Sequence, residues 1–365
     1  MTQQASAPAP VIESLDPEPR PNVDLHFLQV PSIYQQLPVD DIPKAFLASS
    51  NRPNPGASLA DLLRDGHFRT AAYVASNELI RSHDPVHILQ LLYTRLACLV
   101  LISRPDIAAQ EANPLIQLLA RDQPGAKDIV PLIPWELRLL LVRLHGMSAE
   151  DGGRRGIMAL YALAGEARAN LSQAREAGND QLVANWKSRL QDLGLRVAEA
   201  LVERGEFETA ERHLDSLTGS DRGEIMYRKA LLRLRGGDVN GAQQIIDKLE
   251  DGSKRACLSA LLLIADGDFP AAINACQQSD DALSVQNLAV CRLYTGHITY
   301  ARDLFEEVIT NHPASPGLLF NLSTVYELCS ERAIEHKTAL VQRVAAKNPA
   351  PHSGGWERAN IDFKL

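Results

Sequence analysis

The sequence predicts an all-α protein built from repeated helical hairpins, and three observations lead to this fold class. The pattern Gly-x-apolar-x-x-Ala recurs at spacings of 32, 30 and 29 residues, beginning at Gly205, Gly237, Gly267 and Gly296. A second small residue precedes each of these glycines by seven positions, at Ala198, Ala230, Ala260 and Ala289. No alternation of apolar and polar residues, the pattern typical of a strand, runs beyond four residues.

A helix-turn-helix unit accounts for these features. Glycine suits the left-handed backbone of the turn, the apolar residue two positions later begins the second helix, and each alanine lies where paired helices approach closely. Units of about 30 to 35 residues are typical of tetratricopeptide repeats, whose full period is about 34. One first helix recurs at the full period, because Asn287-Leu288-Ala289 is followed 34 residues later by Asn321-Leu322-Ser323. Residues 181–348 are therefore predicted to form a tetratricopeptide-like solenoid.

The chain before this array divides into two parts. Residues 1–24 hold five prolines, and this density predicts a disordered lead. Residues 25–180 are predicted to be an irregular segment followed by degenerate helical hairpins, beginning with a short helix over 42–48. Ser58 followed by Asp61 is a capping pair. The repeat-like unit that begins there contains Gly66 and Ala71 and is expected to reach residue 82.

Hydrophobic periodicity, together with prolines and glycines, places the remaining elements. Helices are predicted over 85–103, 113–121, 134–145, 157–177 and 181–204, and, after the repeats, over 316–328 and 331–347. Residues 122–134 contain three prolines and a glycine and are predicted to be a loop, and residues 148–156 a turn. Residues 349–365 are expected to form an extended C-terminal tail, because Pro349, Pro351 and Gly354 disfavour a helix.

Composition narrows the classes of function. Hydrophobic residues make up 45% of the 365-residue chain and aromatic residues only 5%, which favours packed helices. The formal net charge of −8 argues against a nucleic-acid-binding surface. Five scattered cysteines without a CxxC pair indicate reduced thiols. With no secretory signal and no apolar run of roughly 18–20 residues, a cytoplasmic protein without direct membrane insertion is expected.

Signatures of catalysis and of cofactor binding are missing from the sequence. It contains no GxxxxGK[ST] or GxGxxG loop for phosphates, no HExxH or Cys/His spacing for zinc, and no GxSxG nucleophile elbow. Cys276 and Cys291 lie on apolar helix faces and are predicted to be buried small hydrophobes. Asp280 and Asp281 precede a predicted helix and are expected to cap it. The prediction is a protein that is not an enzyme, with no catalytic residue, cofactor or metal.

A repeat array provides a surface for binding other proteins, because stacked hairpins leave a concave groove lined by their first helices. Residues ten positions before each turn glycine are expected to face this groove. The candidates for partner binding there are Tyr227, Gln286, Phe320 and Thr324, with Cys257 in the same row. A second candidate is the apolar face of the last helix, at Ile334, Leu340 and Val344. The alternative for that face is that it covers the last repeat.

A carboxylate clamp, which holds the acidic C-terminus of a chaperone, is a second use of such a groove. It needs Lys, Asn and Arg side chains that converge from three adjacent repeats. Asn287 and Asn321 are present, but Cys257, Leu261 and Gln286 occupy the positions where the other partners would lie. A free-standing tetratricopeptide cochaperone or peptide adaptor therefore stays as the alternative function.

The last repeats carry a more specific string than the repeat pattern itself. Residues 319–328 read Leu-Phe-Asn-Leu-Ser-Thr-Val-Tyr-Glu-Leu, and Lys337, Leu340, Val344 and Lys347 follow at helical positions. Shorter strings that contribute to the same resemblance lie earlier in the chain, at Ala289-Val290-Cys291, Leu293-Tyr294, Trp186, Ser188-Arg189-Leu190, Leu89-Gln90-Leu91 and Arg95-Leu96-Ala97. Over roughly residues 59–347 the chain resembles the trafficking protein particle (TRAPP) complex subunit 12 family.

This resemblance implies a non-catalytic scaffold and assembly subunit of a vesicle-tethering complex in ER-to-Golgi traffic, with autophagy as a further process. It implies contacts with other TRAPP subunits, especially the large accessory subunits. It also implies an indirect link to a Rab GTPase, because other subunits of that complex carry nucleotide exchange. The location it implies is cytoplasmic and peripheral, at the ER–Golgi intermediate compartment or the Golgi.

Overall fold

The computed structural model describes residues 23–120, 126–148, 153–217, 221–250, 252–348 and 355–365. Over these ranges the secondary structure consists of α-helices and 3₁₀ turns and includes no strand, so the predicted all-α class is confirmed. The predicted lead, residues 1–24, lies outside the described residues except for its last two.

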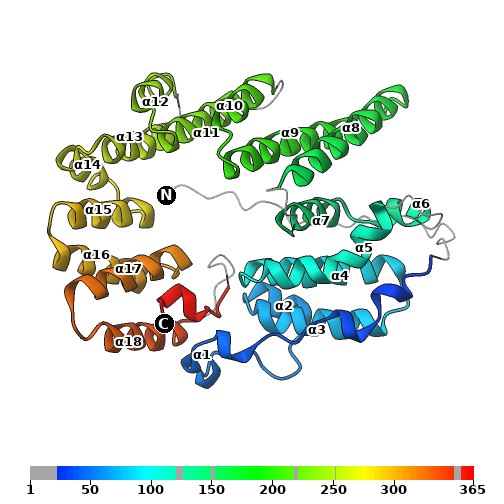
Figure 1. The fold of residues 1–365 in the computed structure, drawn as a ribbon, viewed down its shortest axis with the longest axis horizontal. Helices are drawn as coiled ribbons and strands as arrows, with labels where there is room; N and C mark the ends of the chain where they lie inside the picture. The colour runs from blue at the N-terminus through cyan, green and yellow to red at the C-terminus, as the bar shows by residue number, and fades with distance from the viewer. Residues whose placement is uncertain (1–22, 121–125, 149–152, 218–220, 251, 349–354) are drawn as a thin grey trace.

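The first half of the chain contains an irregular segment and then long helices (Figure 1). Its 3₁₀ turns are η1 (His26–Leu28), η2 (Pro31–Ile33), η3 (Val39–Asp41) and η4 (Val130–Leu132). Its helices are α1 (Lys44–Ala48), α2 (Leu59–Arg64), α3 (Phe68–Arg81), α4 (Pro85–Leu101), α5 (Pro105–Ala120), α6 (Ala126–Ile129), α7 (Trp135–Ser148), α8 (Arg154–Glu176) and α9 (Asp180–Glu203). The predicted cap at the start of α2 is present, because the Ser58 hydroxyl accepts a hydrogen bond from the backbone N–H of Asp61.

The second half is the repeat array. Its elements are α10 (Phe207–Ser216), α11 (Arg222–Arg235), α12 (Val239–Ile246), α13 (Gly252–Asp266), α14 (Phe269–Cys276), α15 (Ala282–Tyr294), α16 (Ile298–Asn311), α17 (Pro316–Cys329), α18 (Ala333–Ala345) and η5 (Asn360–Phe363). The four turn glycines have φ between +76° and +83°, as the hairpin requires. The alanines of the pattern are buried between the paired helices, at Ala210, Ala242, Ala272 and Ala301.

Three sequence predictions differ from the structure. Helix α5 begins at Pro105 rather than at residue 113, because the helix continues through Pro114, which loses only one backbone hydrogen bond. The predicted loop over 122–134 contains α6 and η4. The tail is not extended throughout, because residues 360–363 form η5, and its Trp356 and Phe363 side chains are buried.

A buried ion pair fixes the irregular N-terminal segment to the first long helices. Arg95 on α4 binds Glu111 on α5 through two hydrogen bonds, with nitrogen–oxygen distances of 2.9 Å and 2.7 Å. The same guanidinium donates to the backbone oxygens of Ala72 and Gln35, at 3.1 Å and 2.8 Å. The backbone N–H of Gln35 donates in turn to Glu111, at 3.0 Å. Because both charges are paired and hydrogen-bonded, they are tolerated in the core.

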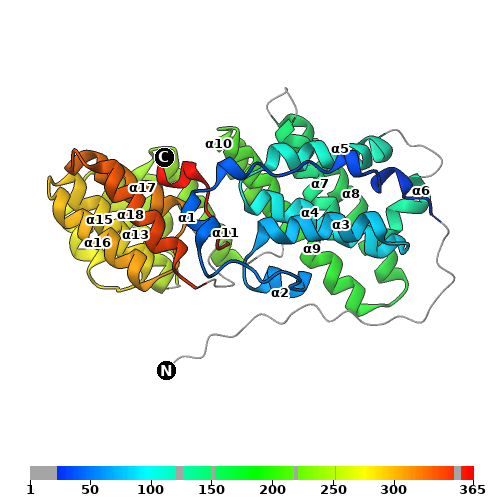
Figure 2. The ribbon, with the colours of Figure 1, turned by 90° about the horizontal axis from the view of Figure 1, so that it is seen from below.

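The helices follow one another around a closed circuit, so the end of the solenoid lies beside its beginning (Figures 1 and 2). Helix α18 packs against α1. The hydroxyl of Ser49, just after α1, donates to the backbone oxygen of Ala345 on α18, at 2.7 Å. The Asn51 side chain donates to the backbone oxygens of Ala346 and Lys347, each at 3.0 Å.

The C-terminal residues complete this closure, and we call the contacts of residues 355–363 with the N-terminal half the clasp. The Trp356 ring lies edge-on to Phe46, at 5.4 Å between centroids, and to His67, at 5.3 Å. Its indole N–H donates to the backbone oxygen of Lys347 at 3.1 Å, and its backbone N–H to that of Gly66 at 3.0 Å. One side chain thus contacts α1, the turn before α3 and the residues after α18.

Two glycines make this approach of backbones possible. Gly66 has φ +76°, and a Cβ there would lie 3.3 Å from the Cα of Gly355. Gly355 has φ +101°, and a Cβ there would lie 3.0 Å from the ring of Phe68. The clasp therefore requires residues without side chains on both sides.

Candidate interaction surface

The first helices of the repeats carry the row of residues that the sequence predicts for partner binding. Helix α12 lies on the outer side of the circuit, whereas α15 and α17 lie nearer its centre (Figure 1). Tyr227 on α11 is partly buried, and the Lys254 ammonium lies 5.6 Å from its ring centroid. Burial raises the pKa of the Tyr227 hydroxyl, so this group stays a neutral hydrogen-bond donor. Gln286 on α15 is partly buried, and its side chain donates to the backbone oxygen of Ala282 at 3.1 Å.

An apolar stripe runs through the same row. Residues four and seven positions after Tyr227, Cys257 and Gln286 share one face of each helix. All six are apolar and partly exposed, and we call them the inner stripe: Leu231, Leu234, Leu261, Ile264, Val290 and Leu293. Partly exposed apolar side chains on neighbouring helices form a surface that a partner can cover.

The chain's own C-terminal residues contact the equivalent row on α17. The Lys364 ammonium lies 5.3 Å from the Phe320 ring centroid and 3.3 Å from the Thr324 hydroxyl oxygen, and it forms an ion pair with Glu327. Lys337 on α18 joins the same carboxylate at 2.6 Å and also donates to the backbone oxygen of Lys364 at 3.0 Å. The structure therefore separates the predicted candidates: Tyr227 and Gln286 border the inner stripe, which is partly buried against the core, whereas Phe320 and Thr324 contact the tail.

The predicted second surface, on the last helix, needs a correction. Leu340 and Val344 are buried in a core cluster with residues of α16 and α17, at 0% and 4% exposure. They cover the last repeat and are not available to a partner. Ile334, at the start of the same helix, is 74% exposed and stays a candidate.

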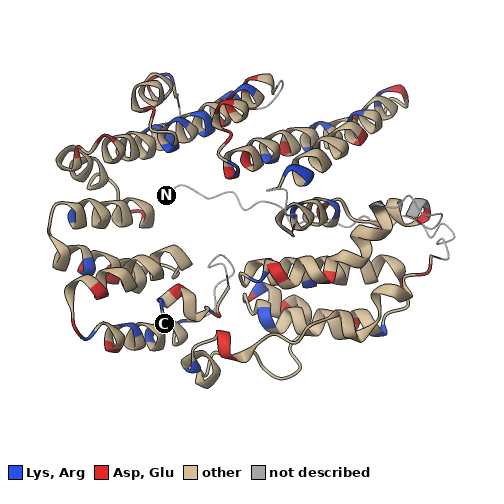
Figure 3. Cartoon of the chain, viewed as in Figure 1, with Lys and Arg blue, Asp and Glu red and all other residues tan. Residues whose placement is uncertain are grey.

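Ion pairs between neighbouring helices balance the charges of the array (Figure 3). Helix α11 is the most basic of the first helices, and its cations meet carboxylates on both sides. Arg228 binds Glu199 on α9 as well as Glu224 on its own helix, the latter at 2.8 Å, and Lys229 binds Asp215 on α10 at 2.7 Å. Lys254 on α13 also binds Glu224, at 3.0 Å. Because these cations are paired, the inner stripe offers mainly apolar contact.

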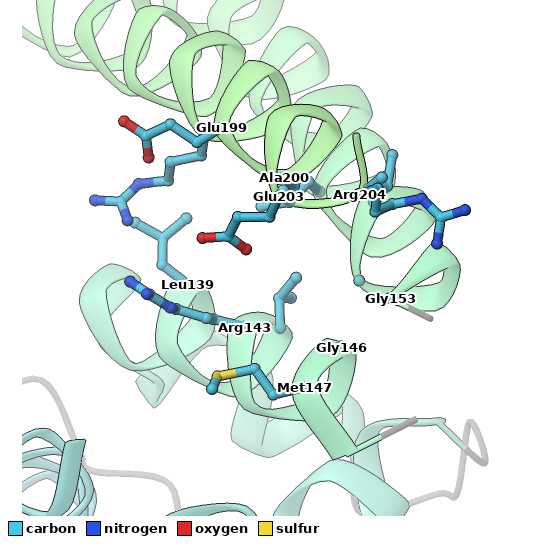
Figure 4. Close-up of a pocket in the computed structure, with 14 residues that line it drawn as sticks. Leu139, Arg143, Gly146, Met147, Gly153, Glu199, Ala200, Glu203 and Arg204 are labelled. Carbon is cyan, nitrogen blue, oxygen red and sulfur yellow. The ribbon is translucent and has the colours of Figure 1, made fainter. Parts of the chain in front are cut away.

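A separate cavity of about 370 Å³ lies between α7, α8 and α9 (Figure 4). Gly146 and Gly156 bring α7 and α8 together at its base, where a Cβ on either would lie 3.0 Å from the other's Cα. Glu203 points into the cavity, and Arg143 lies on the opposite wall (Figure 4). Apolar side chains and charges of both signs line it.

The described residues include neither a cluster of metal ligands nor a membrane-spanning helix. Across the described ranges, no three His, Cys, Asp or Glu side chains lie close enough to hold a metal ion. None of the helices described is long and apolar enough to cross a membrane. Cys276 and Cys291 are buried, as the sequence predicts, and burial raises the pKa of the Cys276 thiol to about 11.

Sequence reasoning missed one prominent cluster. Trp135 on α7 and Trp186 on α9 meet edge to face, with ring centroids 5.7 Å apart, and the Arg189 guanidinium lies against both rings. Trp186 and Arg189 are three residues apart, so they share a helix face. The spacing of Trp186 and Arg189 could have indicated their contact from the sequence. The contact with Trp135 could not be predicted, because Trp135 is distant in the sequence and lies on another helix.

Comparison with known proteins agrees with the fold and the resemblance. A family profile described as tetratricopeptide repeat matches residues 286–315. Trafficking protein particle complex subunit 12 of Homo sapiens is 25% identical over 328 residues, covering 74% of this chain and 42% of that protein. The Mus musculus subunit 12 is 25% identical over 318 residues, covering 71% and 37%. The chain thus spans about two fifths of the length of these relatives.

Among solved structures, the crystal structure of the tetratricopeptide domain of P58(IPK) matches 79% of this chain and 90% of that chain. The sequence identity is 16% and the TM-score is 0.22, so the two chains superpose poorly as whole structures. The helical hairpins and the sequence matches are sufficient without it: the chain is a tetratricopeptide-repeat solenoid similar to trafficking protein particle complex subunit 12.

Proposed function

We propose that this protein is a non-catalytic scaffold subunit of a TRAPP-type tethering complex in ER-to-Golgi traffic. Its role there is to hold other subunits, especially the large accessory subunits, and through them it is linked to a Rab GTPase. The similarity to subunit 12 along about three quarters of the chain supports the complex. The observation that carries the binding role is the inner stripe, a row of partly exposed apolar side chains on three successive first helices.

The proposed mechanism is burial of this stripe against a partner. A stable and specific interface typically buries about 1,200 to 2,000 Å² in total, and its binding energy is concentrated in a few aromatic or long side chains. Tyr227 is the aromatic residue beside the stripe, with Gln286 further along the same row. Ile334 is an exposed apolar residue outside this row and a secondary contact. Phe320 and Thr324 contact Lys364 of the tail, and Phe320 is still 46% exposed.

Affinity purification of the tagged full-length protein from its own cells tests the proposal. We expect a near-stoichiometric complex that contains small Rab-exchange subunits and large accessory subunits. Tyr227→Ala should lower its recovery by roughly tenfold, because loss of an interface aromatic weakens binding by about that factor or more. Tyr73→Ala on α3 is the matched control, because Tyr73 is an exposed aromatic residue far from the stripe. Recovery of chaperones alone, or of no partner, would contradict the proposal and favour the alternative of a free-standing cochaperone or peptide adaptor.

A further inference from the structure

The cluster of two tryptophans and an arginine contains an unusual guanidinium. The Cζ atom of Arg189 lies 4.6 Å from the Trp186 ring centroid and 5.0 Å from that of Trp135. Because the two rings are perpendicular, the planar guanidinium can stack face to face on at most one of them, and such stacking leaves N–H donors in its plane free to bind. Within the described part of the chain, no hydrogen bond or ion pair reaches these donors from a protein group.

The surroundings of Arg189 form a shallow pocket of about 630 Å³ between α7, α8 and α9. Residues 130–134, which include Pro131 and Pro134, form one wall, and both tryptophans form another. Glu166 and Asn170 on α8 supply the polar rim, together with the two arginines of the pocket. The pocket therefore combines apolar walls with a partly buried cation that contacts both tryptophan rings.

The charges of the pocket are unequal. It contains two guanidinium groups, Arg138 and Arg189, and one carboxylate, Glu166. Glu166 is already in an ion pair with Arg138. Burial lowers the pKa of Arg189, and the nearby charges that act on it are Glu136, which is not within ion-pair distance, and Arg138. One positive charge in the pocket is thus left without a paired anion among the described residues.

We propose that Trp135, Trp186 and Arg189 form a binding site for an Asp or Glu side chain of a protein partner, with an apolar residue of the same partner segment packed on the tryptophans and prolines. A planar carboxylate matches two parallel N–H donors of a guanidinium, and Arg bound in this way discriminates strongly between Asp and Asn. The single excess positive charge matches a carboxylate better than a phosphate, which carries nearly two negative charges. The site lies outside the inner stripe, so it does not depend on the complex proposed above.

Peptide titration of the full chain, followed by NMR, tests this site. The probes are three peptides, acetyl-Pro-Leu-Asp-Leu-amide and its Asn and phosphoserine counterparts. The three tryptophans of the chain give three indole N–H signals, and Trp356 in the clasp serves as the internal control. The Asp peptide should shift the Trp135 and Trp186 signals and leave that of Trp356 in place. The Asn peptide should bind at least about tenfold more weakly, as expected for loss of a charge-assisted contact.

Variants separate a binding role from a structural one. Arg189→Gln should weaken binding of the Asp peptide by about tenfold or more, and Arg189→Lys, which keeps the charge but not the paired donors, should also weaken it. Arg143→Ala removes an arginine of the cavity in Figure 4 and should leave binding unchanged. If Arg189→Gln fails to fold by circular dichroism, Arg189→Lys decides.

Three results would overturn the proposal. One is equal binding of the Asp and Asn peptides, and another is absence of a shift up to about 10 mM peptide, a concentration well above any useful affinity. The third is much tighter binding of the phosphoserine peptide, which would assign the site to a phosphate. Each of these is independent of which complex is recovered by affinity purification.

Discussion

At the scale of single residues, Asp281 shows how one carboxylate begins a helix. It accepts hydrogen bonds from the Ser279 and Ser284 hydroxyls, at 2.5 Å and 2.6 Å, and from the backbone N–H groups of Leu283 and Ser284, each at 3.0 Å. These bonds, with the two hydroxyls first, lower the pKa of Asp281 to about 2. Of the two aspartates that the sequence nominates as caps, the second is the one that caps α15.

The lowered pKa predicts a pH-dependent contribution to stability. Because the folded pKa is below the ordinary value of 3.8, this contribution is complete above about pH 4 and is lost as the pH falls toward 2. Asp281→Asn should remove this dependence but keep most of the cap, whereas Asp281→Ala should lower the free energy of unfolding by about 1 kcal/mol.

Urea unfolding at about pH 5 and about pH 3 measures the difference. Asp280→Asn is the control, because no hydrogen bond to its side chain is present among the described residues. An equal loss of stability at low pH in the parent and in Asp281→Asn would contradict the assignment.

Sequence reasoning reached Asp281 because caps are local, but it could not reach Arg95 and Glu111. These two lie 16 residues apart on different helices, and their side chains are 2% and 0% exposed. A charged residue in a helical pattern is ordinarily assigned to the solvent side. Only the fold reveals that both charges are buried and paired.

At the scale of elements, α18 separates residues that cover the fold from those that face solvent. Leu340 is fully buried and Ile334 is 74% exposed on the same helix. Leu340→Asp should destabilise the protein by several kcal/mol, because it places a carboxylate in an apolar core. Ile334→Asp should change stability by about 0.5 kcal/mol or less, as a surface substitution does.

Thermal unfolding followed by circular dichroism distinguishes the two variants. A folded Leu340→Asp protein that loses only its partner would restore the interface prediction for this face. A folded Ile334→Asp protein with reduced recovery of the complex would support Ile334 as a contact. The pair therefore tests the corrected assignment of both residues.

The elements that sequence reasoning placed well are those whose ends carry local signals. The first helix of each repeat ends at a glycine with positive φ, and several of these helices begin at a capping residue, so their bounds follow from the sequence to within a few residues. The predicted start of α5 is too late in the sequence, because Pro114 resembles the first residue of a helix. The folding of η5 could not be predicted, since it depends on contacts with α17.

At the scale of the whole molecule, the clasp determines whether the solenoid is closed. Trp356→Ala removes the side chain that joins α1, the turn before α3 and the end of α18. We expect a loss of about 3 to 5 kcal/mol in the free energy of unfolding of the closed form, as for other buried Trp-to-Ala changes. The opened solenoid should have a larger radius of gyration in small-angle X-ray scattering.

Tyr73→Ala is the control for this measurement, because Tyr73 is an exposed aromatic residue outside the clasp. An unchanged radius of gyration in Trp356→Ala would show that α1 and α18 hold the circuit closed without the tail. No periodic pattern in the sequence predicts that the circuit of helices is closed. It joins residues about 300 positions apart, among them Asn360, whose side chain donates to the backbone oxygen of Asp40 at 2.7 Å.

The clasp also has a consequence for synthesis of the chain. Phe46 belongs to the same core cluster as Leu340, Trp356 and Phe363, so these partners are made about 300 residues after it. At about 5 to 20 residues per second, roughly 15 to 60 s pass between their appearance on the ribosome. During that time Phe46 on α1 lacks these core partners. The Phe46 side chain therefore reaches its buried position only after Leu340, Trp356 and Phe363 have been synthesised.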